Sequence, residues 1–145
     1  MLLGVGLILI AEETGRILVL KELKSKPIIQ KQAGMLSFPL ETVKKGEGKY
    51  DAVKRLLLEE VGVDISIISL GPIFFGGTME IFTQIAYTIQ AYALCKQEFV
   101  VTPNDTDIEF YGWMNPKDLL KCQFIRAEVP PIINLFLSKK RFGYN

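Results

Sequence analysis

The sequence lacks histidine altogether among its 145 residues. This absence excludes histidine bases, Ser-His-Asp and Cys-His nucleophile systems, and histidine ligands to a metal. Cysteine is scarce too: Cys95 and Cys122 are the only two, and they cannot complete a zinc site without other ligands. Any acid–base or metal chemistry must therefore rest on carboxylates, lysine, tyrosine or water. Unpaired cysteines suit a reducing compartment, so we expect a cytoplasmic protein.

A surplus of charge of either sign is missing as well. The chain has 17 lysines and arginines against 16 aspartates and glutamates, a net charge of +1. Nothing in this balance favours a nucleic-acid duplex or an anionic membrane as a partner. The apolar run of residues 2–10 is shorter than the ~20 residues that span a membrane, and it lacks the basic start of a signal peptide. We therefore predict a buried strand there.

The remaining pattern predicts a single domain over residues 1–145, long enough to bury a core. Apolar alternation and turn residues predict a β-hairpin over 3–23, then a polar loop over 24–34 and short strands over 35–43 interrupted at Pro39. After residues 39–63 they predict a strand over 65–75 with a bend at Gly71-Pro72, and a hairpin turn at Gly76-Gly77. Two further strands are predicted over 82–94 and 110–114. A short helix is expected after Asn115, and a terminal helix from Pro130 to Lys140. The predicted fold class is α/β, with a mixed β-sheet between helices.

The most informative stretch is residues 39–63, which reads as a short strand, a loop closed by Gly46-Glu47-Gly48, and a helix that ends at Gly62. At ~100° per residue, this helix has an apolar stripe that faces the core. The stripe is formed by Tyr50, Val53, Leu57 and Val61. Glu60 falls at the edge of the stripe, Glu59 and Arg55 fall further round, and Leu56 falls between the two glutamates.

Two adjacent carboxylates beside a core stripe repel each other, and a cation or an arginine relieves the repulsion. Their hard oxygen atoms suit Mg²⁺ or Mn²⁺. The spacing also allows a plainer interpretation, in which both glutamates are solvated. Arg55 and Glu59 would then form an i,i+4 pair that contributes about 0.3–0.5 kcal/mol.

This stretch resembles the Nudix box, whose pattern is G-x5-E-x7-R-E-U-x-E-E-x-G-U, with U a bulky aliphatic residue. Seven of its nine defined positions match at the right spacing, and they are Glu47, Arg55, Leu57, Glu59, Glu60, Gly62 and Val63. The resemblance extends over roughly residues 3–140. It implies the Nudix fold, an α/β/α sandwich.

By this resemblance, the protein is a metal-dependent hydrolase that cleaves a diphosphate linkage in a nucleoside diphosphate derivative. Glu59 and Glu60 would hold Mg²⁺ or Mn²⁺. Arg55 would orient the carboxylates or stabilise the loop, and Glu47 would tie the loop to the helix. The general base would be Glu59 or an acidic residue of 105–109. The partner would be a small nucleotide, with its substrate-binding residues unknown, and a homodimer is compatible with the family.

Two positions of the box over residues 41–63 depart from the pattern. Glu41 stands where the box opens with glycine, and Leu56 stands where the family generally has a metal-binding glutamate. These changes predict weakened metal binding, which Glu41 itself would partly restore if it lay near Glu60. They also leave open an alternative function, a catalytically inactive Nudix fold that binds nucleotides or regulates.

Three further groups carry open alternatives. The lysines of the 24–34 loop either attract an anionic substrate or are simply solvated. The acidic residues Asp105, Asp107 and Glu109 either supply a metal ligand or base or belong to a solvated loop. Tyr87 and Tyr92 either stack on a nucleobase or pack within the sheet, and packing is the commoner role for such residues.

Overall fold

The computed structural model describes residues 2–63, 73–80 and 85–141. The strands are β1 (Leu2–Ala11), β2 (Ile17–Glu22), β3 (Leu36–Ser37), β4 (Leu40–Thr42), β5 (Phe74–Glu80), β6 (Ile85–Cys95) and β7 (Ile108–Met114). The helical elements are the 3-10 turn η1 (Pro27–Ile29), the helix α1 (Lys49–Leu56), the π-helical turn η2 (Leu57–Val61), and the helices α2 (Pro116–Lys121) and α3 (Val129–Arg141).

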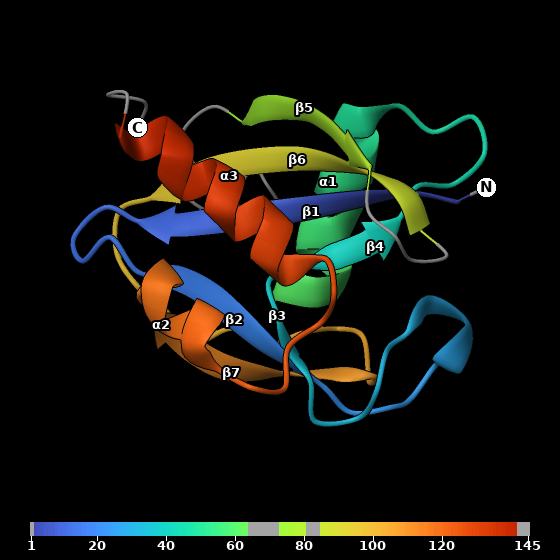
Figure 1. Ribbon diagram of the computed structural model, residues 1–145, viewed down its shortest axis with the longest axis horizontal. Coiled ribbons are helices and arrows are strands. Elements are labelled where there is room, and N and C mark those ends of the chain that lie inside the picture. The colour runs from blue at the N-terminus through green and yellow to red at the C-terminus, as the bar shows by residue number, and fades with distance from the viewer. Residues whose placement is uncertain (1, 64–72, 81–84, 142–145) are drawn as a thin grey trace.

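The seven strands form one mixed sheet in the order β3-β2-β1-β6-β5, with β4 paired to β1 and β7 paired to β2. Strand β1 runs parallel to β6 from Leu2 to Ala11. Its other edge is shared, because β4 pairs with Gly4 to Gly6 and β2 pairs only at Ile10. Helices α1 and α3 lie on opposite sides of the sheet (Figure 1). The predicted α/β/α sandwich is confirmed.

Strand β1 shows why the N-terminal run is almost wholly apolar. Its alternate side chains point to opposite faces, and helices cover both of these faces. Leu7 and Leu9 pack in the core on the side of α1, whereas Ile8 and Ile10 pack in the core on the side of α3. All four are at most 8% exposed. The predicted buried strand is confirmed.

Other local predictions have mixed outcomes. The β1–β2 hairpin, the strands either side of Pro39, and the helices after Asn115 and near Pro130 are confirmed. The hairpin turn predicted at Gly76-Gly77 is wrong, because both glycines lie inside β5, where the register with β6 shifts between Phe75 and Gly77. Glycine is common at such bulges as well as in turns. The predictions for residues 65–72 and 82–84, including the Gly71-Pro72 bend, lie outside the described residues.

The helix of the 39–63 stretch begins at Lys49 and continues from α1 into η2, and Gly62 ends it with φ +76°. Three residues of the predicted stripe, Val53, Leu57 and Val61, are fully buried. The prediction for Tyr50 is wrong: it is 50% exposed, in the first turn of the helix. Ala52 and Leu56 are buried instead. Among the described residues, no helix is long and apolar enough to cross a membrane.

Candidate active site

Arg55 is the hub that joins the helix to the preceding loop and strand. Its Nε and Nη2 donate to the two carboxylate oxygens of Glu47 at 2.9 and 3.0 Å. Its Nη2 also donates to the Thr42 carbonyl at 2.9 Å, and its Nη1 donates to Glu41 at 2.5 Å. The two-pronged bond from Arg55, helped by the Lys44 N–H, lowers the pKa of Glu47 to about 2. Arg55 thus joins the helix to Glu47 in the loop and to Thr42 in β4.

Glu60 lies at the bottom of the site, on the side of η2 that faces β4. Its side chain is 6% exposed, and its Oε1 accepts the backbone N–H of Leu40 at 3.0 Å. This bond fixes the carboxylate against the strand that carries Glu41. Burial raises the pKa of Glu60 well above its ordinary value, and the Glu41 carboxylate raises it further. Glu60 is therefore a fixed, buried carboxyl group whose ionised form is disfavoured by burial and by Glu41 more than the Leu40 N–H and Arg126 favour it.

Glu41 stands where the Nudix box usually has glycine, and the structure gives its side chain a place in the site. Burial is the main factor that raises the pKa of Glu41 to about 8, and the nearby Glu59 and Asp105 carboxylates raise it further. The Arg55 guanidinium opposes this shift without overcoming it. A divalent cation between these carboxylates would offset both the cost of burying their negative charge and their mutual repulsion.

Asp105 enters the site because its loop is docked on the end of the helix. The backbone N–H groups of Asn104 and Asp105 both donate to the Glu59 carbonyl at 2.9 Å, and the Asn104 side-chain amide donates to the Leu58 carbonyl at 2.8 Å. These bonds satisfy carbonyls that the end of a helix leaves open. The loop is thereby held beside Glu60.

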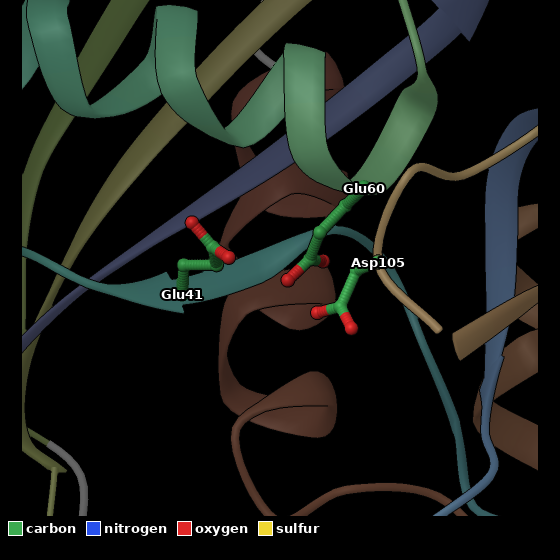
Figure 2. Close-up of side chains that lie close together, drawn as sticks. All are labelled: Glu41, Glu60 and Asp105. Atoms are coloured by element: carbon green, nitrogen blue, oxygen red, sulfur yellow. The ribbon is translucent and has the colours of Figure 1, made fainter. Parts of the chain in front are cut away.

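Glu41, Glu60 and Asp105 converge from a strand, a helix end and a loop on one small space (Figure 2). One carboxylate oxygen from each lies within 4.8 Å of the others. Oxygen atoms so arranged suit Mg²⁺ or Mn²⁺, which take carboxylates together with water molecules. The residues present therefore fit a divalent cation.

Glu59, expected as a metal ligand, lies beside this group rather than within it. Its carboxylate is 40% exposed and lies 3.3 Å from Nη1 of Arg55. Leu56, where the family has a carboxylate, is fully buried in the core with Val53 and Leu57. The place of that carboxylate is thus taken up by apolar packing. The carboxyl groups that lie with Glu60 come instead from Glu41 and Asp105.

Of the other residues that the sequence suggested for the site, some lie at the pocket and others do not. Asp107 lies at the site and pairs with Lys24 at 2.9 Å, while Glu109 is exposed on β7. Tyr92 is 3% exposed and stacks on Phe136 with ring centroids 5.7 Å apart, so packing within the core is its role. The Tyr87 side chain lies outside what the structure describes.

An open pocket of about 250 Å³ is lined by these carboxylates together with basic side chains. These basic residues are Lys26, Lys31, Arg55 and Arg126. Sequence reasoning missed Arg126 and its buried partners Glu22 and Glu128. The available signal was a glutamate, Glu22, shortly after the apolar run of β2, and it does not reveal its partner.

Comparisons with known proteins agree with the fold and with the family. Three solved structures are similar over most of their length. The MutT protein from Methanosarcina mazei Go1 has a TM-score of 0.70 and 18% identity, over 96% of this chain and 94% of that chain. The E. coli dihydroneopterin triphosphate pyrophosphohydrolase has a TM-score of 0.63 and 16% identity, over 92% of this chain and 93% of that chain, and a C. elegans Ap4A hydrolase has a TM-score of 0.64 and 17% identity, over 97% and 99%. A search of curated protein sequences gave no match. The family model for the NUDIX domain matches residues 2–136. The chain therefore belongs to the Nudix family.

Proposed function

We propose that this protein is a metal-dependent hydrolase that cleaves a diphosphate linkage in a nucleoside diphosphate derivative. The observation that carries the proposal is the convergence of Glu41, Glu60 and Asp105 at an open pocket within a Nudix fold. Similar folds include a triphosphate pyrophosphohydrolase and an Ap4A hydrolase by name, which supports a phosphate-chain substrate. Because the sequence identity to these proteins is only 16–17%, the similarity shows the fold, and the proposed substrate class rests mainly on the carboxylates and the pocket.

Glu41, Glu60 and Asp105 would hold Mg²⁺ or Mn²⁺. When bound, such an ion neutralises phosphate oxygens and favours attack by water. Arg55 positions Glu41 and Glu59 through its Nη1, and Glu47 fixes Arg55 in turn. We expect metal binding weaker than that of a complete box, because Leu56 leaves one ligand position apolar.

Glu59 is the proposed proton acceptor. Its carboxylate borders the cluster, and it is the most exposed of the glutamates around Arg55. In the reaction, a water oxygen forms a bond to phosphorus while the bond from phosphorus to the bridging oxygen breaks. The water proton passes to the Glu59 carboxylate, and the bridging oxygen leaves with the second phosphate.

The test is product release from a panel of nucleoside diphosphate derivatives, with and without Mg²⁺ or Mn²⁺. We expect turnover only with the metal, and a loss of at least about 10–100-fold in Glu60→Gln. Glu109→Gln is the matched control, because Glu109 is exposed and lies outside the three-carboxylate group. Turnover that persists without metal, or that survives Glu60→Gln unchanged, contradicts the proposal.

A second candidate is a catalytically inactive Nudix module that binds nucleotides or regulates. One specific observation favours it: Leu56 is fully buried, so the family's third carboxylate has no room in this core. This candidate predicts nucleotide binding with no turnover under any metal condition. The same panel, read by calorimetry as well as by product release, separates the two functions.

The assembly and setting of the chain remain predictions. The family match over residues 2–136 supports a single domain. A cytoplasmic location and a homodimer are expectations from cysteine content and family resemblance. Light scattering of the purified protein tests the homodimer.

A further inference from the structure

We propose that Lys26 and Lys31, backed by Arg126, form a clamp for the second phosphate of the diphosphate, the one not held at the carboxylates. This inference rests on the proposed hydrolase function for its ligand. The clamp lies in the connection between β2 and β3, which borders the same pocket as Glu41 and Glu60. Lys26 and Lys31 come from this connection and Arg126 from the segment before α3, and all three line the pocket together with Glu41, Glu60, Asp105 and Asp107.

The backbone holds the two lysines side by side. Lys26 and Lys31 form an isolated antiparallel bridge, in which the Lys26 N–H donates to the Lys31 carbonyl at 2.7 Å and the reverse bond measures 3.2 Å. The 3-10 turn η1 closes the hairpin between them, and Gln30 makes the reversal at φ +55°. Both ammonium groups are therefore presented to the pocket by one short, hydrogen-bonded hairpin.

Neither lysine has its hydrogen-bonding capacity used up within the described part of the chain. An ammonium group has three N–H donors. Lys26 is exposed and has no ion pair or hydrogen bond from its side chain among the described residues. The Lys31 Nζ lies 3.5 Å from an oxygen of Glu22, a contact too long for a good hydrogen bond. Donors thus remain available for phosphate oxygens.

Arg126 supplies positive charge behind the hairpin. It is 2% exposed, yet it lies at the pocket lining. Its Nη1 and Nη2 reach Glu22 and Glu128 at 3.5 and 3.4 Å, while its Nε has no partner among the described residues. Glu22 and Glu128 already offset the charge of Arg126, but its Nε remains a buried donor without a partner among the described residues, which is costly. Bonds between Leu36 and the backbone of Phe124 and Arg126 hold it in place.

Two groups of side chains in the pocket lining have different tasks, although Asp107 lies near Lys26 and Lys31, so the lysine end is not purely basic. Glu41, Glu60 and Asp105 would repel a bare diphosphate, so phosphate binding at that end needs a divalent cation. The Lys26–Lys31 hairpin attracts phosphate directly. Binding of a diphosphate should therefore need both groups, and binding of the metal and of the diphosphate should strengthen each other.

The test is calorimetric binding of imidodiphosphate, a diphosphate analogue with nitrogen in place of the bridging oxygen, in the presence of Mg²⁺. We expect Lys26→Ala to raise the Kd about tenfold, because a charge-assisted hydrogen bond is lost. Lys26→Arg should stay within about twofold of the wild type, since it keeps the charge and donors. Lys117→Ala is the matched control, because Lys117 is an exposed lysine on α2 that does not line the pocket.

Lys31→Met should weaken binding as well, and the double variant should be weaker than either single variant. Loss of Lys31 also leaves buried Glu22 with Arg126 as its remaining ion-pair partner among the described residues, so thermal unfolding must show that this variant is folded. The decision does not depend on it, because Lys26 is exposed and its replacement leaves no hydrogen-bonded or ion-paired side chain behind in the described part of the chain. Orthophosphate should bind more weakly than imidodiphosphate and be less sensitive to Lys26→Ala.

The clamp and the hydrolase proposal fail separately. Imidodiphosphate binding that depends on Lys26 in a protein without turnover supports the clamp and removes the hydrolase. Metal-dependent turnover combined with wild-type imidodiphosphate affinity in both Lys26→Ala and the double variant removes the clamp and leaves the hydrolase. Equal affinity for orthophosphate and imidodiphosphate also overturns the assignment to a second phosphate.

Discussion

Gly62 lies so close to Thr102 that a Cβ at position 62 would overlap the Thr102 carbonyl oxygen. The glycine ends the metal-site helix at φ +76°, and the loop that follows Thr102 caps the same helix end and carries Asp105. One glycine therefore satisfies two requirements, a left-handed helix end and close approach of a second segment. The position of Asp105 beside Glu60 depends on this contact.

Gly62→Ala should lower the free energy of unfolding by more than the ~1–2 kcal/mol of a left-handed backbone alone, because the loop must also move. Gly15→Ala is the matched control, since Gly15 has φ +74° with nothing near its missing Cβ. Urea unfolding of both variants measures the difference. Equal losses would mean that the contact with Thr102 adds nothing.

Leu56→Glu restores the box in sequence but should damage the fold. Leu56 is fully buried among apolar side chains, so a carboxylate there is desolvated without a partner, and we expect a loss of about 3 kcal/mol or more. Leu58→Glu, two residues along the same helix at a side chain 49% exposed, should be nearly neutral. Thermal and urea unfolding decide this. A stable Leu56→Glu protein with increased turnover would instead favour the inactive-module interpretation of the wild type.

Metal affinity should depend on carboxylates outside the helix. Glu41→Gln and Asp105→Asn each remove a charged ligand from the group of three, and we expect each to weaken Mg²⁺ or Mn²⁺ binding by about tenfold or more. Glu109→Gln should leave affinity unchanged. Calorimetric titration with Mn²⁺ gives the dissociation constants of the three variants for comparison with that of the wild type. Unchanged affinity in both site variants would place the metal elsewhere.

The stability of the metal-free protein should fall as pH rises. The pKa of Glu41 is raised from 4.5 to about 8, and that of Glu60 is raised too, so the folded state binds protons that the unfolded state has released. The contribution of protonated Glu41 to the free energy of unfolding is fully present below about pH 4.5 and is lost as the pH rises through about 8. Melting temperatures measured with a chelator across this range test the sign.

Two companion measurements sharpen that pH test. Added Mg²⁺ should raise the melting temperature more at pH 8 than at pH 5, because the ion binds the ionised carboxylates. Glu41→Gln should flatten the metal-free pH dependence while reducing the Mg²⁺ effect. A metal-free protein that gains stability between pH 5 and 8 would show that these carboxyl groups do not control it.

Much of this protein can be predicted from local sequence, because local physics decides it. Repeated apolar residues require a buried β1, the spacing of Glu47 and Arg55 brings loop and helix together, and Gly62 ends the helix. The local predictions that were wrong concern residues whose sequence pattern is compatible with two different structures. Gly76 and Gly77 suit a bulge as well as a turn, and Tyr50 in the first helical turn is 50% exposed beside Lys54 rather than buried in the core.

The composition of the site was decided only by the tertiary structure. Glu41, Asp105, Lys26 and Arg126 come from segments that are distant in sequence, and no periodicity relates them. Their meeting depends on how β4, the 102–105 loop and the β2–β3 connection pack around one helix end. The sequence by itself determined the family fold and the Arg55–Glu47 anchor. Packing determined which charges surround Glu60, because the interaction of charges depends on their distance in space and their burial, and neither is encoded in sequence spacing.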